Sequence, residues 1–101
     1  MEGTILIRVM IVDDHALVRS GLKALLNEAG EVEVVGEAAD GDEAIRLAEQ
    51  VNPDVVLMDL SMPHGKDGLT ATKEMRERFP ETAILILTMH DDDEYLFRAI
   101  Q

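Results

Sequence analysis

The feature that most constrains the fold is a short apolar run, Val55-Val56-Leu57-Met58, which is bounded by Asp54 and Asp59. The run does not alternate with polar residues, which is typical of a strand buried on both faces inside a parallel sheet. Residues 5–12 and 83–88 are almost wholly apolar in the same way. Because parallel strands need long crossover connections, the sequence predicts an α/β protein.

Amphipathic segments separate these runs. Over residues 16–29 the apolar residues recur at helical spacing, and Gly30 favours a helix end. Further helices are predicted at residues 43–51, where the turn Asp40-Gly41-Asp42 supplies the N-cap, at residues 68–79, and after the acidic run at 91–93. The residues expected to face the core are Val18, Leu22, Leu25, Ala29, Ala44, Ala48, Val51, Thr72, Met75, Phe79, Leu96, Ala99 and Ile100.

Residues 31–38 differ from the other strands because glutamates alternate with small or apolar residues. This pattern predicts a strand with one solvent-exposed face at the edge of the sheet, where charge also prevents mispairing. Strand and helix thus alternate four times. The prediction is a single domain over residues 1–101, a doubly wound, flavodoxin-like parallel sheet with helices on both sides and right-handed crossovers.

The charge balance disfavours several classes of function. Nine Lys and Arg stand against 21 Asp and Glu, for a net charge of −12, which is the opposite of a nucleic-acid-binding surface. The sequence has no cysteine, no apolar run long enough to span a membrane and no charged-then-apolar leader. We therefore expect a cytoplasmic domain that binds neither DNA nor a membrane.

Polar residues follow three of the predicted strands. Asp13 and Asp14 follow the first, Asp59 ends the third and Thr88 ends the fourth. The carboxyl ends of parallel strands meet at the crevice where strand order reverses, so these side chains are expected in one pocket. Mg²⁺, or Mn²⁺ in its place, suits such oxygen ligands. A carboxylate beside the cation can accept a phosphoryl group, to which Thr88 can donate a hydrogen bond.

Three motifs, Val12-Asp13-Asp14-His15, Met58-Asp59-Leu60-Ser61-Met62-Pro63 and Leu87-Thr88, resemble those of the receiver domain of bacterial two-component response regulators. The resemblance spans the whole chain. Leu17-Val18-Arg19 and the Asp40-Gly41 turn look most like the NarL/LuxR type, transcriptional regulators in which a helix-turn-helix DNA-binding domain follows the receiver. No such second domain is present in the 101 residues.

The resemblance implies a role for each site residue. Asp59 is the phosphoacceptor, Asp14 and Asp59 are direct Mg²⁺ ligands together with the backbone carbonyl of Ser61, Asp13 holds the ion mainly through water, and Thr88 is the switch hydroxyl. The implied protein is a phosphorelay component rather than an enzyme, although it can promote its own phosphorylation and dephosphorylation. Its implied partners are a sensor histidine kinase, contacted through the first helix around Arg19 and Leu22, and another receiver.

Two departures from the family pattern stand out. The loop at residues 62–68 is one residue longer than usual, which bears on partner contacts. The family also continues into a fifth strand that carries a switch aromatic and a phosphoryl-pairing lysine, and the sequence ends before both; neither Tyr95 nor Lys66 is expected to replace them. The fourth strand would then be an undefended apolar edge, through which we expect the chain to self-associate.

Other functions remain alternatives. The main one is a receiver-shaped interaction module that no longer switches on phosphorylation. A flavodoxin-like cofactor binder is disfavoured because Asp13 and Asp14 stand where its phosphate loop would lie. A metal-dependent phosphatase with an aspartyl nucleophile needs a general acid at position 61, where Ser61 stands. His15 is interpreted as a helix-start residue that bonds locally rather than as a metal ligand, because no second His or Cys lies at ligand spacing.

Overall fold

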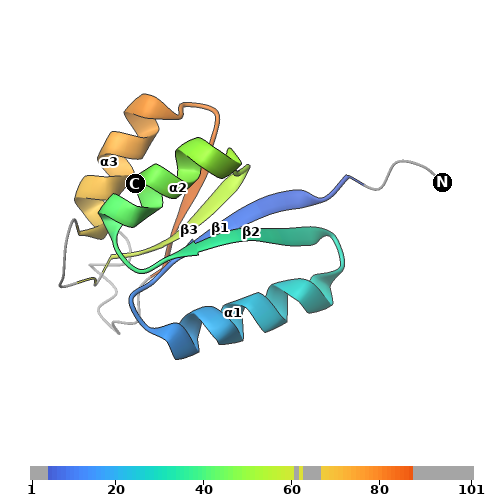
Figure 1. The fold of residues 1–101 in the computed structure, drawn as a ribbon. Coiled ribbons are helices and arrows are strands. Elements are labelled where there is room, and N and C mark those ends of the chain that lie inside the picture. The colour runs from blue at the N-terminus through green and yellow to red at the C-terminus, as the bar shows by residue number, and fades with distance from the viewer. Residues whose placement is uncertain (1–4, 61, 63–66, 88–101) are drawn as a thin grey trace.

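The computed structural model describes residues 5–60, 62 and 67–87. Within these ranges strands and helices alternate in the order β1 (Ile7–Val12), α1 (Ala16–Ala29), β2 (Val32–Ala38), α2 (Gly41–Val51), β3 (Val55–Asp59), α3 (Gly68–Arg78) and β4 (Ala83–Leu87) (Figure 1). The strands form one parallel sheet in the order β2-β1-β3-β4. The predicted doubly wound α/β fold is confirmed. The helix predicted after residues 91–93 lies outside the described residues.

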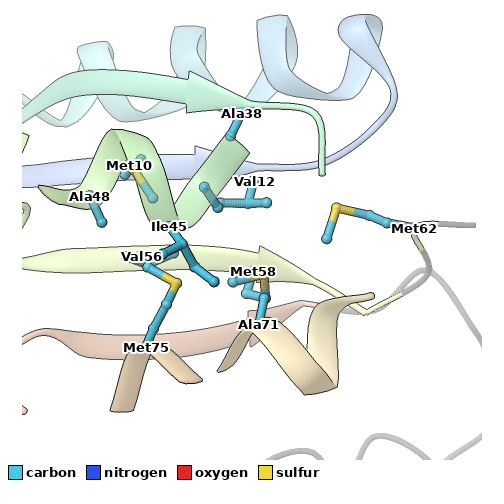
Figure 2. Packing of buried hydrophobic residues seen from close by; sticks show 11 residues of the cluster. Met10, Val12, Ala38, Ile45, Ala48, Val56, Met58, Met62, Ala71 and Met75 are labelled. Carbon is cyan, nitrogen blue, oxygen red and sulfur yellow. The ribbon is translucent and has the colours of Figure 1, made fainter. Parts of the chain in front are cut away.

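Helices α2 and α3 cover one face of the sheet, and α1 lies on the other (Figure 1). The larger core lies under α2 and α3, where methionines from both layers meet (Figure 2). Met10 of β1, Met58 of β3 and Met75 of α3 are all fully buried there. Flexible methionine side chains fill irregular gaps well, which suits them to this junction of three elements.

Helix α1 covers its face of the sheet less completely. Leu22 and Leu26 pack against buried residues of β1 and β3, but no residue of α1 is itself buried. The prediction that Leu25 faces the core is wrong, because 66% of it is exposed, and Ala29 is exposed as well. Leu26 is four residues after Leu22 and so continues the row of side chains that points at the sheet. The prediction chose Leu25, three residues after Leu22, where the structure uses Leu26.

Strand β2 is an edge strand, as predicted, but its side chains do not keep to one face. Its pairing with β1 passes over Val35, an extra residue that makes a β-bulge. Before the bulge Val34 packs on the α1 side, whereas after it Ala38 packs on the α2 side. The predicted single solvent-exposed face is therefore wrong. Gly36, just after the bulge, leaves room for α2, because a Cβ at this position would lie 2.7 Å from the side chain of Leu47.

Side chains and backbone geometry fix the helix ends. The Asp40 carboxylate accepts a 2.8 Å hydrogen bond from the Glu43 N–H, so α2 begins at Gly41, inside the predicted capping turn and two residues before the predicted start at Glu43. The Asp67 carboxylate accepts a 2.7 Å bond from the Thr70 N–H at the start of α3. Gly30 ends α1 with φ 80°, in the left-handed region that favours glycine. These caps set where α2 and α3 begin relative to the ends of β2 and β3.

Strand β4 forms the second edge of the described sheet and pairs with β3 along its whole length. Leu85, at its centre, is exposed although the strand carries no charged residue. Such an edge can add a further strand. Among the described helices, none has both the length and the apolar character needed to cross a bilayer.

Candidate functional site

The carboxyl ends of β1 and β3 bring three acids together, as predicted. Asp13 and Asp14 follow β1, and Asp59 is the last residue of β3. One ligand atom from each of these carboxylates and from His15 lies within 4.8 Å of all the others. Asp13 and Asp59 are only 3% and 2% exposed. Two buried carboxylates with a third beside them make this the most concentrated negative charge among the buried residues described.

His15 is the N-cap of helix α1, and both its backbone and its ring contact the acidic cluster. Its backbone N–H donates to Asp13 Oδ1 at 2.8 Å. Its ring Nδ1 lies 3.0 Å from Asp13 Oδ1 and 2.9 Å from Asp14 Oδ1. The hydrogen bond with Asp13, followed by the charge of Asp14, raises the pKa of His15 above its ordinary value of 6.5. The predicted local hydrogen bond is confirmed, whereas the contact with both acids was not foreseen.

Arg19 of α1 forms hydrogen bonds next to the acidic cluster. Its Nη1 donates to the backbone oxygen of Asp13 at 2.6 Å, and its Nε donates to Glu37 Oε1 at 3.1 Å. The side chain is therefore only 19% exposed. Leu22 also faces the sheet. The two residues that the family resemblance associates with kinase contact thus point inward. The large apolar side chains that α1 exposes are Leu17, which is 84% exposed, and Leu25.

Gly68 positions the end of β3. A Cβ at Gly68 would lie 2.3 Å from the backbone oxygen of Asp59 and 2.7 Å from Cα of Leu60. Only glycine therefore lets α3 begin so close to the strand end, and the packing of α3 fixes the backbone that carries Asp59. Our sequence analysis did not identify Gly68 as a site residue. The available signal was the Asp67-Gly68 pair, which combines a helix cap with a residue that has no side chain.

The remaining predicted site residues are not described. Ser61, whose carbonyl was predicted as a metal ligand, and Thr88, the predicted switch hydroxyl, lie outside the described residues. Lys66 and Tyr95 lie outside them as well. Leu60 and Met62, on either side of Ser61, are buried, so the chain immediately after Asp59 is anchored in the core.

The residues present fit a hard divalent cation. Buried carboxylates need a charged partner or a metal ion, because the cost of burying an isolated charge is high. The donor set of Asp13, Asp14 and Asp59 is rich in carboxylate oxygens, which are ligands that Mg²⁺ and Mn²⁺ prefer. These three carboxylates can therefore hold such an ion together with water.

Comparison with known proteins agrees with this geometry. The family described as "Response regulator receiver domain" matches residues 9–101. The chain belongs to the response regulator receiver family. This receiver domain is 53% identical over 94 residues to the oxygen regulatory protein NreC of Staphylococcus haemolyticus and to that of Staphylococcus aureus strain JH9. The match covers 93% of this chain but 43% of each relative, so the receiver spans less than half of their length.

Solved receiver domains share the fold. The signal receiver domain of the putative response regulator NarL from Mycobacterium tuberculosis aligns with a TM-score of 0.85 and 38% identity, covering 96% of this chain and 77% of that one. The isolated REC domain of RcsB from Salmonella enterica serovar Typhimurium, solved in the presence of phosphomimetic BeF3−, aligns with a TM-score of 0.85 and 34% identity, covering 94% and 70%. Both comparisons agree with a receiver of the NarL/LuxR type.

Proposed function

We propose that this receiver domain accepts a phosphoryl group on Asp59 from a sensor histidine kinase, and that Mg²⁺ assists the transfer. The observation that carries the proposal is the burial of Asp59 at the end of β3, with Asp13 and Asp14 within ligand distance of it. In this proposal Asp14, Asp59 and the carbonyl of Ser61 bind the ion directly, and Asp13 holds it mainly through water.

The proposed chemistry assigns a task to each group. An Asp59 carboxylate oxygen attacks phosphorus, a new O–P bond forms, and the bond to the donor's leaving group breaks with its electrons on that group. Mg²⁺, when bound, neutralises charge on the transferring oxygens. The hydroxyl of Thr88 donates a hydrogen bond to the phosphoryl group. Burial of Asp59 restricts water, which protects the acyl phosphate from immediate hydrolysis.

The positioning residues act around this centre. The backbone N–H of His15 donates to the Asp13 carboxylate, and the Arg19 guanidinium donates to the Asp13 carbonyl. Both bonds fix the turn that presents Asp13 and Asp14 to the ion. On the other side, the absence of a Cβ at Gly68 leaves room for the backbone oxygen of Asp59. The site is thereby preorganised before a phosphodonor arrives.

The proposed partners follow from the exposed surfaces and from the relatives. We infer that the kinase contacts α1, where Leu17 is exposed, and that β4 supports self-association, because Leu85 lies uncharged and exposed along that edge. One solved relative is RcsB bound to promoter rprA, so we propose that the whole protein regulates transcription in the cytoplasm. A net charge of −12 argues that DNA binding is not a task of this domain.

A phosphodonor assay tests the proposal. Acetyl phosphate and Mg²⁺ are added to the wild type, to Asp59→Asn and to Asp54→Asn, which alters the exposed carboxylate just before the other end of β3. Intact mass should show one phosphoryl group on the wild type and on Asp54→Asn, and none on Asp59→Asn. If no folded protein acquired the group, the domain would instead be an interaction module that does not switch. A phosphoryl group on Asp59→Asn would show that another residue is the acceptor.

A further inference from the structure

The nitrogen of an imidazole lies among the carboxylates of the proposed metal site. His15 Nδ1 is 2.9 Å from Asp14 Oδ1 and 3.0 Å from Asp13 Oδ1. One ring nitrogen of His15 also lies within 4.8 Å of a carboxylate oxygen from each of Asp13, Asp14 and Asp59. The ring is held there by its own backbone, because the His15 N–H donates to Asp13 Oδ1. The side chain makes no capping hydrogen bond at the start of α1.

These spacings match those of ligands that share one ion. Two atoms at adjacent corners of an octahedron lie about 3.0 Å apart when each is about 2.1 Å from the metal. The distance from His15 Nδ1 to Oδ1 of Asp14, a proposed direct ligand, is 2.9 Å and so has this value. When Nδ1 carries no proton, its lone pair and the carboxylate oxygens could therefore offer an ion a mixed nitrogen and oxygen ligand set.

We propose that His15 is a further ligand of this metal site, through Nδ1, and that it shifts the preference of the site from Mg²⁺ toward divalent transition metals. The inference rests on the proposed metal site at the three acids. Mg²⁺ selects oxygen ligands, whereas Ni²⁺ and its neighbours accept imidazole nitrogen and bind mixed nitrogen and oxygen sites more strongly. The exposed side of the ring leaves Nε2 free to bond to solvent, as a neutral imidazole bound through Nδ1 requires.

Calorimetric titration of Mg²⁺ and Ni²⁺ into the 101-residue protein tests this proposal, at a pH where imidazole is neutral. The proteins compared are the wild type, His15→Ala, Asp13→Asn, the double variant and Asp59→Asn. His15→Ala removes the ring but keeps the backbone N–H that donates to Asp13. His15→Phe keeps a ring without nitrogen and serves as the second variant. The expected result is a Ni²⁺ affinity lower by about tenfold or more in both His15 variants, with Mg²⁺ affinity changed by less than about threefold.

The double variant identifies a shared ion. Because His15 and Asp13 are already hydrogen-bonded to each other, a shared ion is indicated only by coupling that appears with Ni²⁺ and not with Mg²⁺. For Ni²⁺ the loss in the double variant should then be smaller than the product of the two single losses. Equal changes for Mg²⁺ and Ni²⁺, or single losses that multiply, would overturn the role of His15 while leaving the three-acid site intact. Mg²⁺ binding that is identical in Asp59→Asn and the wild type would instead overturn the proposed site itself, and the proposal for His15 with it.

Discussion

Replacing Gly68 with alanine should destabilise the domain, whereas the same change at Gly21 should stabilise it. At Gly68 the new Cβ would lie 2.3 Å from the Asp59 carbonyl oxygen and 2.7 Å from Cα of Leu60, both backbone atoms. At Gly21, inside α1, no atom lies within 4 Å of the added Cβ. Packed carbon atoms prefer about 3.5–4.0 Å, so at Gly68 either α3 or the end of β3 must move.

The effects of the two substitutions on the free energy of unfolding can be compared. Overpacking of this kind costs about 1–3 kcal/mol. Alanine in a helix interior is more stable than glycine by up to about 1 kcal/mol. At Gly21 this is the only effect that we expect. The free energies of unfolding of the two variants should therefore differ by roughly 1–4 kcal/mol, a large share of a total of about 5–15.

Urea denaturation followed by circular dichroism measures this difference, and an unchanged m-value shows that only stability has changed. Gly68→Ala should also bind Mg²⁺ more weakly, because the displaced backbone carries Asp59. If Gly68→Ala were as stable as the wild type, or less destabilised than Gly21→Ala, the close approach of α3 to β3 would not be what positions the site.

Three further outcomes are expected. In an NMR titration the pKa of His15 should lie above 6.5 and fall in Asp14→Asn; the associated stability is present below 6.5 and is lost as the pH rises through the raised pKa. Asp67→Ala should cost about 1 kcal/mol at neutral pH, as loss of an N-cap does. The hydrogen bond from the Thr70 N–H lowers the pKa of Asp67 below 3.8, so urea melts should show this difference vanish as the pH falls through that lowered pKa. Sedimentation of the 101-residue chain should show self-association at low micromolar concentration that Leu85→Lys abolishes, and a wild-type monomer would rule out pairing through β4.

The sequence predicted the fold where a residue's environment follows from its own segment. The unbroken apolar runs of β1 and β3 indicated burial on both faces, and each strand does contribute to both clusters, Met10 and Val9 pointing to opposite sides. The prediction failed where the pairing with a neighbouring strand decides which face a side chain points to. The alternation of residue types in β2 continues through the bulge at Val35, so nothing in the segment itself marks the point where the faces exchange.

The same distinction applies to the site. The meeting of Asp13, Asp14 and Asp59 could be predicted because parallel strands end at one edge. The place of His15 could not, because it depends on the turn between β1 and α1, where its backbone N–H bonds to Asp13. The inward direction of Arg19 likewise depends on Glu37 of β2, which lies 18 residues away in sequence.

The proposed role of Asp59 as the phosphoacceptor can be checked by locating the phosphoryl group chemically. After reaction with acetyl phosphate and Mg²⁺, borohydride reduces an aspartyl phosphate to homoserine, and peptide mass mapping then identifies the altered position. We expect homoserine at position 59 alone, with Asp13, Asp14 and Asp54 unchanged. Homoserine at another aspartate, or phosphate retained on a histidine or serine with Asp59 intact, would contradict it.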